Sequence, residues 1–291
     1  MKDSNDNLYF NSELMDSLST AAPMNPVCEL RSSARALLLE SGIAAKVSGT
    51  HALSDLWLQH QIMLDTQAVL ATDVAVPGRP EKPLLVAPRQ LKHRSMVTVE
   101  GRAALVHALA HIEFNAINLA LDVIWRFAGM PEQYYADWLQ VAAEEALHFS
   151  LLEKHLQTLG FAYGDFDAHN SLWDMAEKTS ADLLARIALV PRTLEARGLD
   201  ATPAVRAKLA QAGDHAAAAI LDVILRDEVG HVATGNRWFG WLCNERGLEP
   251  VAAYAELAVR FNAPVLRGPF NLAARRAAGF SEQELALLSQ H

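Results

Sequence analysis

Two long stretches with the apolar spacing of helices, residues 98–127 and 132–159, are separated by a short Gly-Met-Pro break at 129–131. In both, apolar residues recur at three- and four-residue intervals, which indicates helices that each bury one face. Thr98 is a suitable cap for the first helix. Because so short a break makes consecutive helices lie antiparallel as neighbours, this region is predicted to form a helical hairpin.

A second hairpin is predicted further along the chain. A third helix begins near Ser171 and is expected to be interrupted at residues 198–203 (GLDATP), where a glycine and a proline favour a helix end. This interruption is either an ordinary helix end or an irregularity at which a substrate channel could form. A fourth helix starts at or after that proline, with Asp214 as the favoured start, and ends at Gly247. No stretch keeps the two-residue period of strands for long, so the predicted fold class is all-α.

The flanks of these hairpins have different patterns. Residues 23–75 are predicted to be helical, with a break at Ser48-Gly49. Residues 76–90 contain four prolines, which predicts an extended connector. The C-terminal tail is expected to add one or two short helices around residues 266–270.

The chain is therefore predicted to have four parts. These are a mobile N-terminal segment (1–22), a helical extension with the proline-rich connector (23–95), a four-helix bundle (96–247) and a helical tail packed on that bundle (248–291).

Two short motifs, EEALHF at 144–149 and DEVGHV at 227–232, each contain a glutamate followed three residues later by a histidine. On a helix these two side chains project from one face. With 18 Glu and 11 His in 291 residues, chance gives about 18 × 11 / 291, or 0.7, such pairs. A single pair is therefore more typical of a solvated helix face than of a metal site.

The spacing of two further glutamates strengthens the metal interpretation. Glu113 lies 32 residues before Glu145, and Glu195 lies 33 residues before Glu228. Residues at the same height in an antiparallel hairpin are equally far from its turn. The first midpoint is Gly129, and the second falls beside Gly213, so both lie at predicted helix breaks.

These residues match what a dinuclear metal site in a helical bundle requires, namely four carboxylates and two histidines from four helices. Four carboxylates balance the charge of two divalent ions, and oxygen with imidazole nitrogen suits iron or manganese. Glu195 could instead pair with a nearby arginine. Glu144 and Asp227, which precede the motif glutamates, could orient the histidines, but they are expected to face solvent. Three other histidines are expected to be structural: His107, His111 and His215.

Five stretches resemble a bacterial family, domain of unknown function 455, and more broadly the ferritin-like di-iron carboxylate proteins, including the tRNA hydroxylase branch. They are HRSMVTVEGRAALVHALAHIEFNAINLALD, DWLQVAAEEALHFSLLEKHLQTLGFAYGDF, LARIALVPRTLEARGLDATP, ILRDEVGHVATGNRWFGWLC and RGPFNLAARRAAG. The resemblance implies a ferritin-like bundle with six metal ligands. Glu113 and Glu195 would be terminal carboxylates, Glu145 and Glu228 bridging carboxylates, and His148 and His231 terminal nitrogen ligands.

The resemblance implies two iron ions, with manganese as the alternative, and an oxygenase-type reaction with O₂, a substrate and an electron donor. The competing hypotheses are metal binding or storage, as in ferritins, and an inert structural metal site. A tRNA substrate is suggested by the hydroxylase branch and opposed by the net charge of −9. The sequence leaves a homodimer open.

The location expected for this chain is the cytoplasm. No apolar run reaches the roughly 18 residues that a membrane span needs. The polar, acidic N-terminus does not have the pattern of a secretory signal. Cys28 and Cys243 are far apart and are expected to be reduced.

Overall fold

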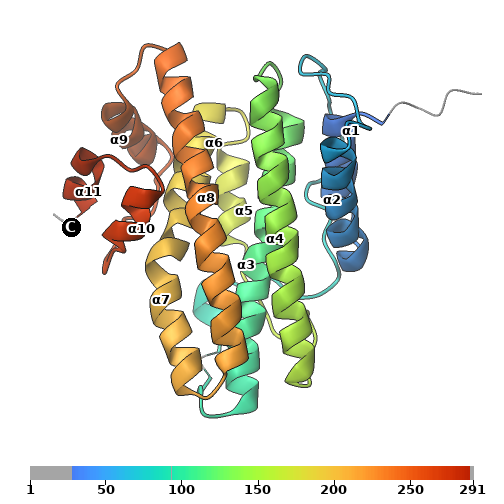
Figure 1. The fold of residues 1–291 in the computed structure, drawn as a ribbon, viewed down its shortest axis with the longest axis vertical. Helices are drawn as coiled ribbons and strands as arrows, with labels where there is room; N and C mark the ends of the chain where they lie inside the picture. Colours follow the sequence, from blue (N-terminus) through green and yellow to red (C-terminus); the bar gives the residue numbers. More distant parts are fainter. Residues whose placement is uncertain (1–27, 93, 289–291) are drawn as a thin grey trace, which may run out of the picture.

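A computed structural model describes residues 28–92 and 94–288, and within these ranges the chain is helical, without a β-strand (Figure 1). The predicted all-α class is thus confirmed for the described residues. The predicted mobile segment, residues 1–22, lies outside them. The long helices run side by side, with the N-terminal helices on one flank and the C-terminal helices on the other (Figure 1).

The first predicted hairpin is present, formed by α3 (Val99–Arg126) and α4 (Glu132–Thr158). The Thr98 hydroxyl accepts a 3.0 Å hydrogen bond from the backbone N–H of Gly101, which caps α3 as predicted. The turn contains Gly129 with φ of +77°, a conformation that glycine adopts without steric cost. The two helices pack along their lengths (Figure 1).

The second hairpin is built from α7 (Ala196–Gln211) and α8 (His215–Glu245). Gly213 turns the chain with φ of +82°, and the Asp214 carboxylate caps α8 through the N–H of Ala217 at 3.0 Å. Both turns therefore lie at the predicted breaks. The hairpins meet where α4 packs against α8.

The predicted interruption at residues 198–203 is wrong, because α7 continues through it with Pro203 inside the helix. A proline has no N–H to give to the carbonyl four residues earlier, here that of Leu199. That carbonyl accepts a hydrogen bond from the Asn271 side chain, 3.2 Å away, so the lost bond is replaced from the C-terminal tail.

The irregular segment lies earlier in the chain than predicted, directly before α7. Two short helices, α5 (Ser171–Lys178) and α6 (Leu183–Leu189), lead into a π-helical segment, η2 (Val190–Glu195). In η2 the Thr193 hydroxyl donates to the carbonyl of Ala188 at 2.9 Å. Glu195 is the last residue of this wider turn, so the irregularity lies directly beside a predicted ligand.

The N-terminal extension is less helical than predicted. It forms α1 (Leu30–Leu39) and α2 (Ile43–Leu58), and the chain from there to the short helix η1 (Pro88–Gln90) is irregular. The predicted break at Ser48-Gly49 is wrong, since both residues lie within α2. A Cβ at Gly49 would come within 2.4 Å of the Leu37 side chain, so this glycine permits close packing of α1 on α2.

The C-terminal tail forms α9 (Pro250–Arg260), α10 (Leu272–Ala277) and α11 (Glu282–Leu288), which is more helix than predicted, and residues 266–270 lie between helices. The buried Arg275 donates to the Asp200 carboxylate at 2.6 Å and anchors α10 to α7. A small apolar cluster fills the space between the tail and the second hairpin; it contains Ala196, Leu199, Val232, Ala278, Phe280 and Leu285.

Among the described residues one helix, α3, is long and apolar enough by composition to cross a membrane, although the sequence was expected to contain no such span. Most of its apolar window, 72%, is buried inside the protein. That burial is the pattern of a core helix in a soluble protein.

Arg31 joins the extension to the end of α3. Its guanidinium is buried and donates to the carbonyls of Ile124 at 3.2 Å and Trp125 at 2.8 Å. It also donates to the carbonyl of Ala68 at 2.6 Å. The last carbonyls of a helix have no partner within it, so Arg31 satisfies two groups that would otherwise be buried and unpaired.

We expect Arg31→Met to lower the free energy of unfolding by about 3 kcal/mol or more, because several buried carbonyls lose their donor. Urea denaturation measures this difference. Arg35→Met, one helical turn away with a single bond to the Ala71 carbonyl, is the control and should cost much less. Equal losses in the two variants would contradict the role assigned to Arg31.

Candidate metal centre

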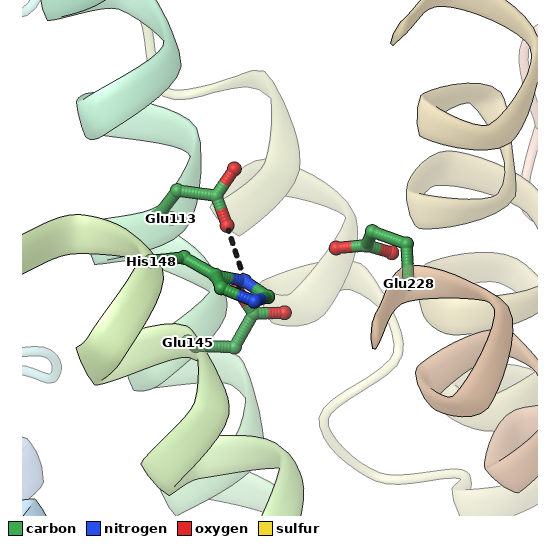
Figure 2. Close-up of side chains that lie close together, drawn as sticks. All are labelled: Glu113, Glu145, His148 and Glu228. Atoms are coloured by element: carbon green, nitrogen blue, oxygen red, sulfur yellow. Dashed lines mark ion pairs between the residues drawn. The ribbon is translucent and has the colours of Figure 1, made fainter. Parts of the chain in front are cut away.

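Four of the predicted ligands meet in the interior between three helices. Glu113 comes from α3, Glu145 and His148 from α4, and Glu228 from α8 (Figure 2). One oxygen or nitrogen from each lies within 4.8 Å of the others, and all four side chains are buried. Acids and histidines so close together in a protein interior form a group that could hold a metal ion.

Glu145 lies between the two predicted histidine ligands. Its Oε2 is 3.4 Å from Nδ1 of His148, and its Oε1 is 3.0 Å from Nδ1 of His231. Nδ1 of His231 is also 3.6 Å from Oε1 of Glu228. The imidazole rings are 5.7 Å apart, so this carboxylate has one oxygen facing each histidine.

Glu195, the last residue of η2, comes to the same cluster from a fourth helical segment. It is not among the four residues that share the 4.8 Å limit. Burial raises its pKa well above the usual value, and the charges of Glu228 and Glu145 raise it further. Glu195 is therefore close enough to interact with the cluster, and no ion pair with an arginine is formed by it within the described residues.

Each of the six predicted ligands has a buried donor or acceptor atom without a hydrogen-bond partner. Among the described residues eleven buried side-chain atoms are unpaired, and seven of them belong to these six side chains. Several of them lie near one another, but without the geometry of a hydrogen bond. Unpaired buried polar atoms are rare in proteins and often mark an ion that satisfies them. The seven atoms are Oε2 of Glu113, both oxygens of Glu145, Nδ1 of His148, Oε2 of Glu195, Oε2 of Glu228 and Nδ1 of His231.

The electrostatics of the cluster agree with this interpretation. Burial raises the pKa of Glu113 well above its usual value, and the neighbouring Glu145 adds to the shift. Burial and Glu145 likewise raise the pKa of Glu228. Burial alone would lower the pKa of His148, but the carboxylates of Glu113 and Glu145 raise it to about 11. Without a metal ion, bound protons must therefore supply part of the positive charge that this site needs.

Glu144 and Asp227 do not simply face solvent, so that prediction is wrong. Nε2 of His148 on α4 lies 3.1 Å from Oδ2 of Asp227 on α8. Nε2 of His231 on α8 lies 2.7 Å from Oε2 of Glu144 on α4. Each acid thus contacts the histidine of the opposite helix, which directs both Nδ1 atoms toward the cluster. The sequence shows an acid directly before each motif glutamate. It does not show which histidine of the opposite helix that acid contacts.

The three other histidines lie outside the cluster, in agreement with the prediction. Nε2 of His107 accepts the N–H of Gly164 at 2.9 Å. Nδ1 of His111 lies 2.8 Å from the hydroxyl of Tyr163. His215 is exposed at the start of α8.

Comparison with known proteins agrees with part of the sequence resemblance. Residues 39–286 match the family described as Protein of unknown function (DUF455). The chain belongs to this family. An uncharacterized protein of Haemophilus influenzae is 53% identical over 213 residues, which cover 71% of this chain and 74% of that protein. No solved structure is significantly similar to this DUF455 protein.

The shifted pKa values predict how pH changes the effect of metal on stability. The raised pKa values of His148 and His231 stabilise the metal-free protein fully below the usual histidine value of 6.5, and this stabilisation is lost as pH rises. The raised pKa values of Glu113, Glu195 and Glu228 have the same effect on stability. Because of them the metal-free protein loses stability as pH rises above the usual glutamate value of 4.5. A bound metal takes the place of these protons.

We therefore expect the increase in Tm caused by Mn²⁺ to be larger at pH 8.5 than at pH 6.5. Thermal unfolding of metal-free and Mn²⁺-loaded protein at each pH measures this increase. The contributions of groups that titrate equally in both forms cancel in the difference between the two Tm values. An increase that stays constant or shrinks with rising pH would argue against proton release from this cluster.

The contacts of Glu144 and Asp227 predict a role in orienting the histidines. We expect Glu144→Gln and Asp227→Asn each to weaken metal binding by about 10- to 100-fold, because loss of such a contact frees the ring orientation. Competition with a chelator of known affinity measures the change. Asp222→Asn is the matched control, since Asp222 is on the same helix as Asp227 but pairs with the exposed Arg206. Unchanged affinity in both test variants would show that these contacts are incidental.

Proposed function

We propose that this protein holds two iron ions, with manganese as the alternative, within a ferritin-like helical unit at residues 96–247. We propose further that it is an O₂-activating oxidoreductase of the hydroxylase type. The observation that carries the proposal is the set of seven unpaired buried atoms on six side chains, which come from α3, α4, η2 and α8. Four carboxylates and two imidazoles from four helical segments are the donor set of a dinuclear site.

The ligand roles that the resemblance implies are compatible with these positions. Glu145, with one oxygen toward each histidine, is suited to bridge two ions. Glu228 would be the second bridge, and Glu113 and Glu195 would each bind one ion from the outer side. His148 and His231 would contribute Nδ1, since their Nε2 atoms are engaged by Asp227 and Glu144. When bound, two reduced irons supply the electrons and the open coordination positions that O₂ chemistry needs.

The residues near the ligands include small, buried side chains. Four alanines near the ligands on their own helices are fully or nearly fully buried: Ala110, Ala116, Ala142 and Ala188. Glu144 also lines a groove of about 590 Å³ between α2 and α4. The contact of Glu144 with His231 therefore lies between the cluster and a surface groove, which gives one route by which protons could reach the site.

The alternative function is metal binding or storage without turnover of a substrate. Storage shells need compact bundles that pack against many copies. Here α1 and α2 pack on the first hairpin and α9 and α10 on α8, so two flanks are already covered by the chain (Figure 1). This coverage favours an enzyme over a shell-forming protein.

Metal analysis of purified variants tests the ligand assignment. We expect Glu145→Ala and His231→Ala to lower bound iron well below the two ions per chain that the wild type should hold, because each removes a buried ligand. Glu153→Ala is the control on α4; Glu153 lies outside the cluster and should leave metal content unchanged. Equal metal content in all three variants would refute the assignment.

Exposure of anaerobically iron-loaded protein to O₂ separates the two functions. A rapid change in the visible absorption spectrum, at two irons per chain, is expected for an O₂-activating site. Iron uptake far beyond two per chain would favour storage. A spectrum that does not respond to O₂ would favour an inert structural site.

A further inference from the structure

A small, partly open cavity of about 60 Å³ lies outside the metal cluster, between α3 and the proline-rich connector. Pro80 and Pro83 of the connector form one wall, and residues of α3 form the other. The connector is fixed there by backbone hydrogen bonds, from Gly78 to Leu38 and from Val86 to Ala168, both 2.8 Å long. The cavity is therefore walled by anchored segments.

Arg79 is the charged residue in this wall. It is half-buried and forms neither a hydrogen bond nor an ion pair with any residue that the structure describes. Burial lowers the pKa of Arg79, while the charges of Glu177 and Asp174 raise it. Neither acid lines the cavity, and their carboxylates accept hydrogen bonds from Trp173 and Asn170. A guanidinium that is partly removed from water and has five free donors favours an oxyanion partner.

The surroundings add to the positive field. Lys46 is fully buried and donates to the carbonyls of Leu38 and Gly78 and to Oδ1 of Asn118, a residue of the cavity wall. The charge of Arg79 contributes to lowering the pKa of Lys46, after the larger effect of burial. Two cations that repel each other across a buried region would both be stabilised by an anion placed near them.

The remaining polar lining is buried and uncharged. Asn115 and Asn118 on α3 are 3% and 2% exposed, and the Tyr163 hydroxyl lies against His111. Burial lowers the pKa of His111 to about 4, so this ring is neutral at neutral pH. No carboxylate lines the cavity. The amide nitrogens of Asn115 and Asn118 bond to His111 and to the Phe114 carbonyl on their own helix, and the Tyr163 hydroxyl is engaged by His111. The guanidinium of Arg79 is therefore the side-chain donor of this wall that has no hydrogen-bond partner among the described residues.

The cavity is separate from the metal centre. At 100° per residue, positions 111, 115 and 118 of α3 lie on the side opposite to Glu113. Its volume exceeds the 10–15 Å³ or so that one water needs, and it is too small for a large organic molecule. The size fits a single carboxylate or phosphate group.

We propose that this cavity is a binding site for a small oxyanion, a carboxylate or a phosphate group, held by the guanidinium of Arg79. The site is independent of the proposed metal chemistry. It would tie the connector to α3 by replacing the missing partner of Arg79.

Calorimetric titration of the full chain with inorganic phosphate and, separately, with acetate tests the proposal, with chloride holding the ionic strength constant. We expect one anion to bind the wild type and to bind Arg79→Gln more weakly by about tenfold or more, because a charge-assisted pair is lost. Arg89→Gln is the matched control; it removes the same charge from an exposed residue of the same segment and should bind as the wild type does. Glu145→Ala should also keep the binding, which separates it from any anion on the metal ions.

A second measurement uses the wild type alone, so it does not depend on the folding of a variant. Arginine modification by phenylglyoxal, followed by peptide mass spectrometry, should be slowed at Arg79 by the bound anion and unchanged at Arg89. Binding of either anion that requires Arg79 supports the site, and the tighter one identifies the group. No binding of either anion, equal binding by Arg79→Gln, or modification of Arg79 at the same rate with and without anion would overturn the proposal.

Discussion

The buried cluster of glutamates and histidines between the two hairpins is the constraint on which the rest of this structure depends. Charged groups in a protein interior cost several kcal/mol each unless they are paired, protonated or bound to a metal. The four residues that come closest together, Glu113, Glu145, His148 and Glu228, lie on α3, α4 and α8, so they meet only when both hairpins are in place. The arrangement of helices and the electrostatics of the cluster therefore depend on each other.

The histidines extend this constraint to the contact between the hairpins. His148 on α4 meets Asp227 on α8, and His231 on α8 meets Glu144 on α4. Each helix thus contributes the histidine of one contact and the acid of the other. Further along the same pair of helices, the Asp137 carboxylate accepts from Nε1 of Trp238 at 2.8 Å. The two hairpins are held in register by polar contacts at several levels along α4 and α8.

Much of the fold could be predicted from the sequence because it depends on local chemistry. The cap at Thr98, the glycine turns at Gly129 and Gly213 and the cap at Asp214 each act within a few residues. The equal distances of the glutamates from the two turns then placed Glu113 beside Glu145 correctly. The predictions that were wrong concern residues whose partners are distant. Gly49 was expected to end a helix but lies where α2 packs against Leu37, and the helix break expected before Pro203 is prevented by a hydrogen bond from Asn271.

The sequence by itself determined the helical class, the two hairpins and the residues able to meet between them, because helix periodicity and turn chemistry are local. Only the tertiary structure decided that Glu144 and Asp227 contact the histidines of the opposite helices and that Arg79 lines a small cavity without a partner among the described residues. These features depend on which helix faces are brought together and on how the connector lies across α3. Such contacts join residues far apart in the chain, and their geometry is set by the packing of side chains rather than by spacing.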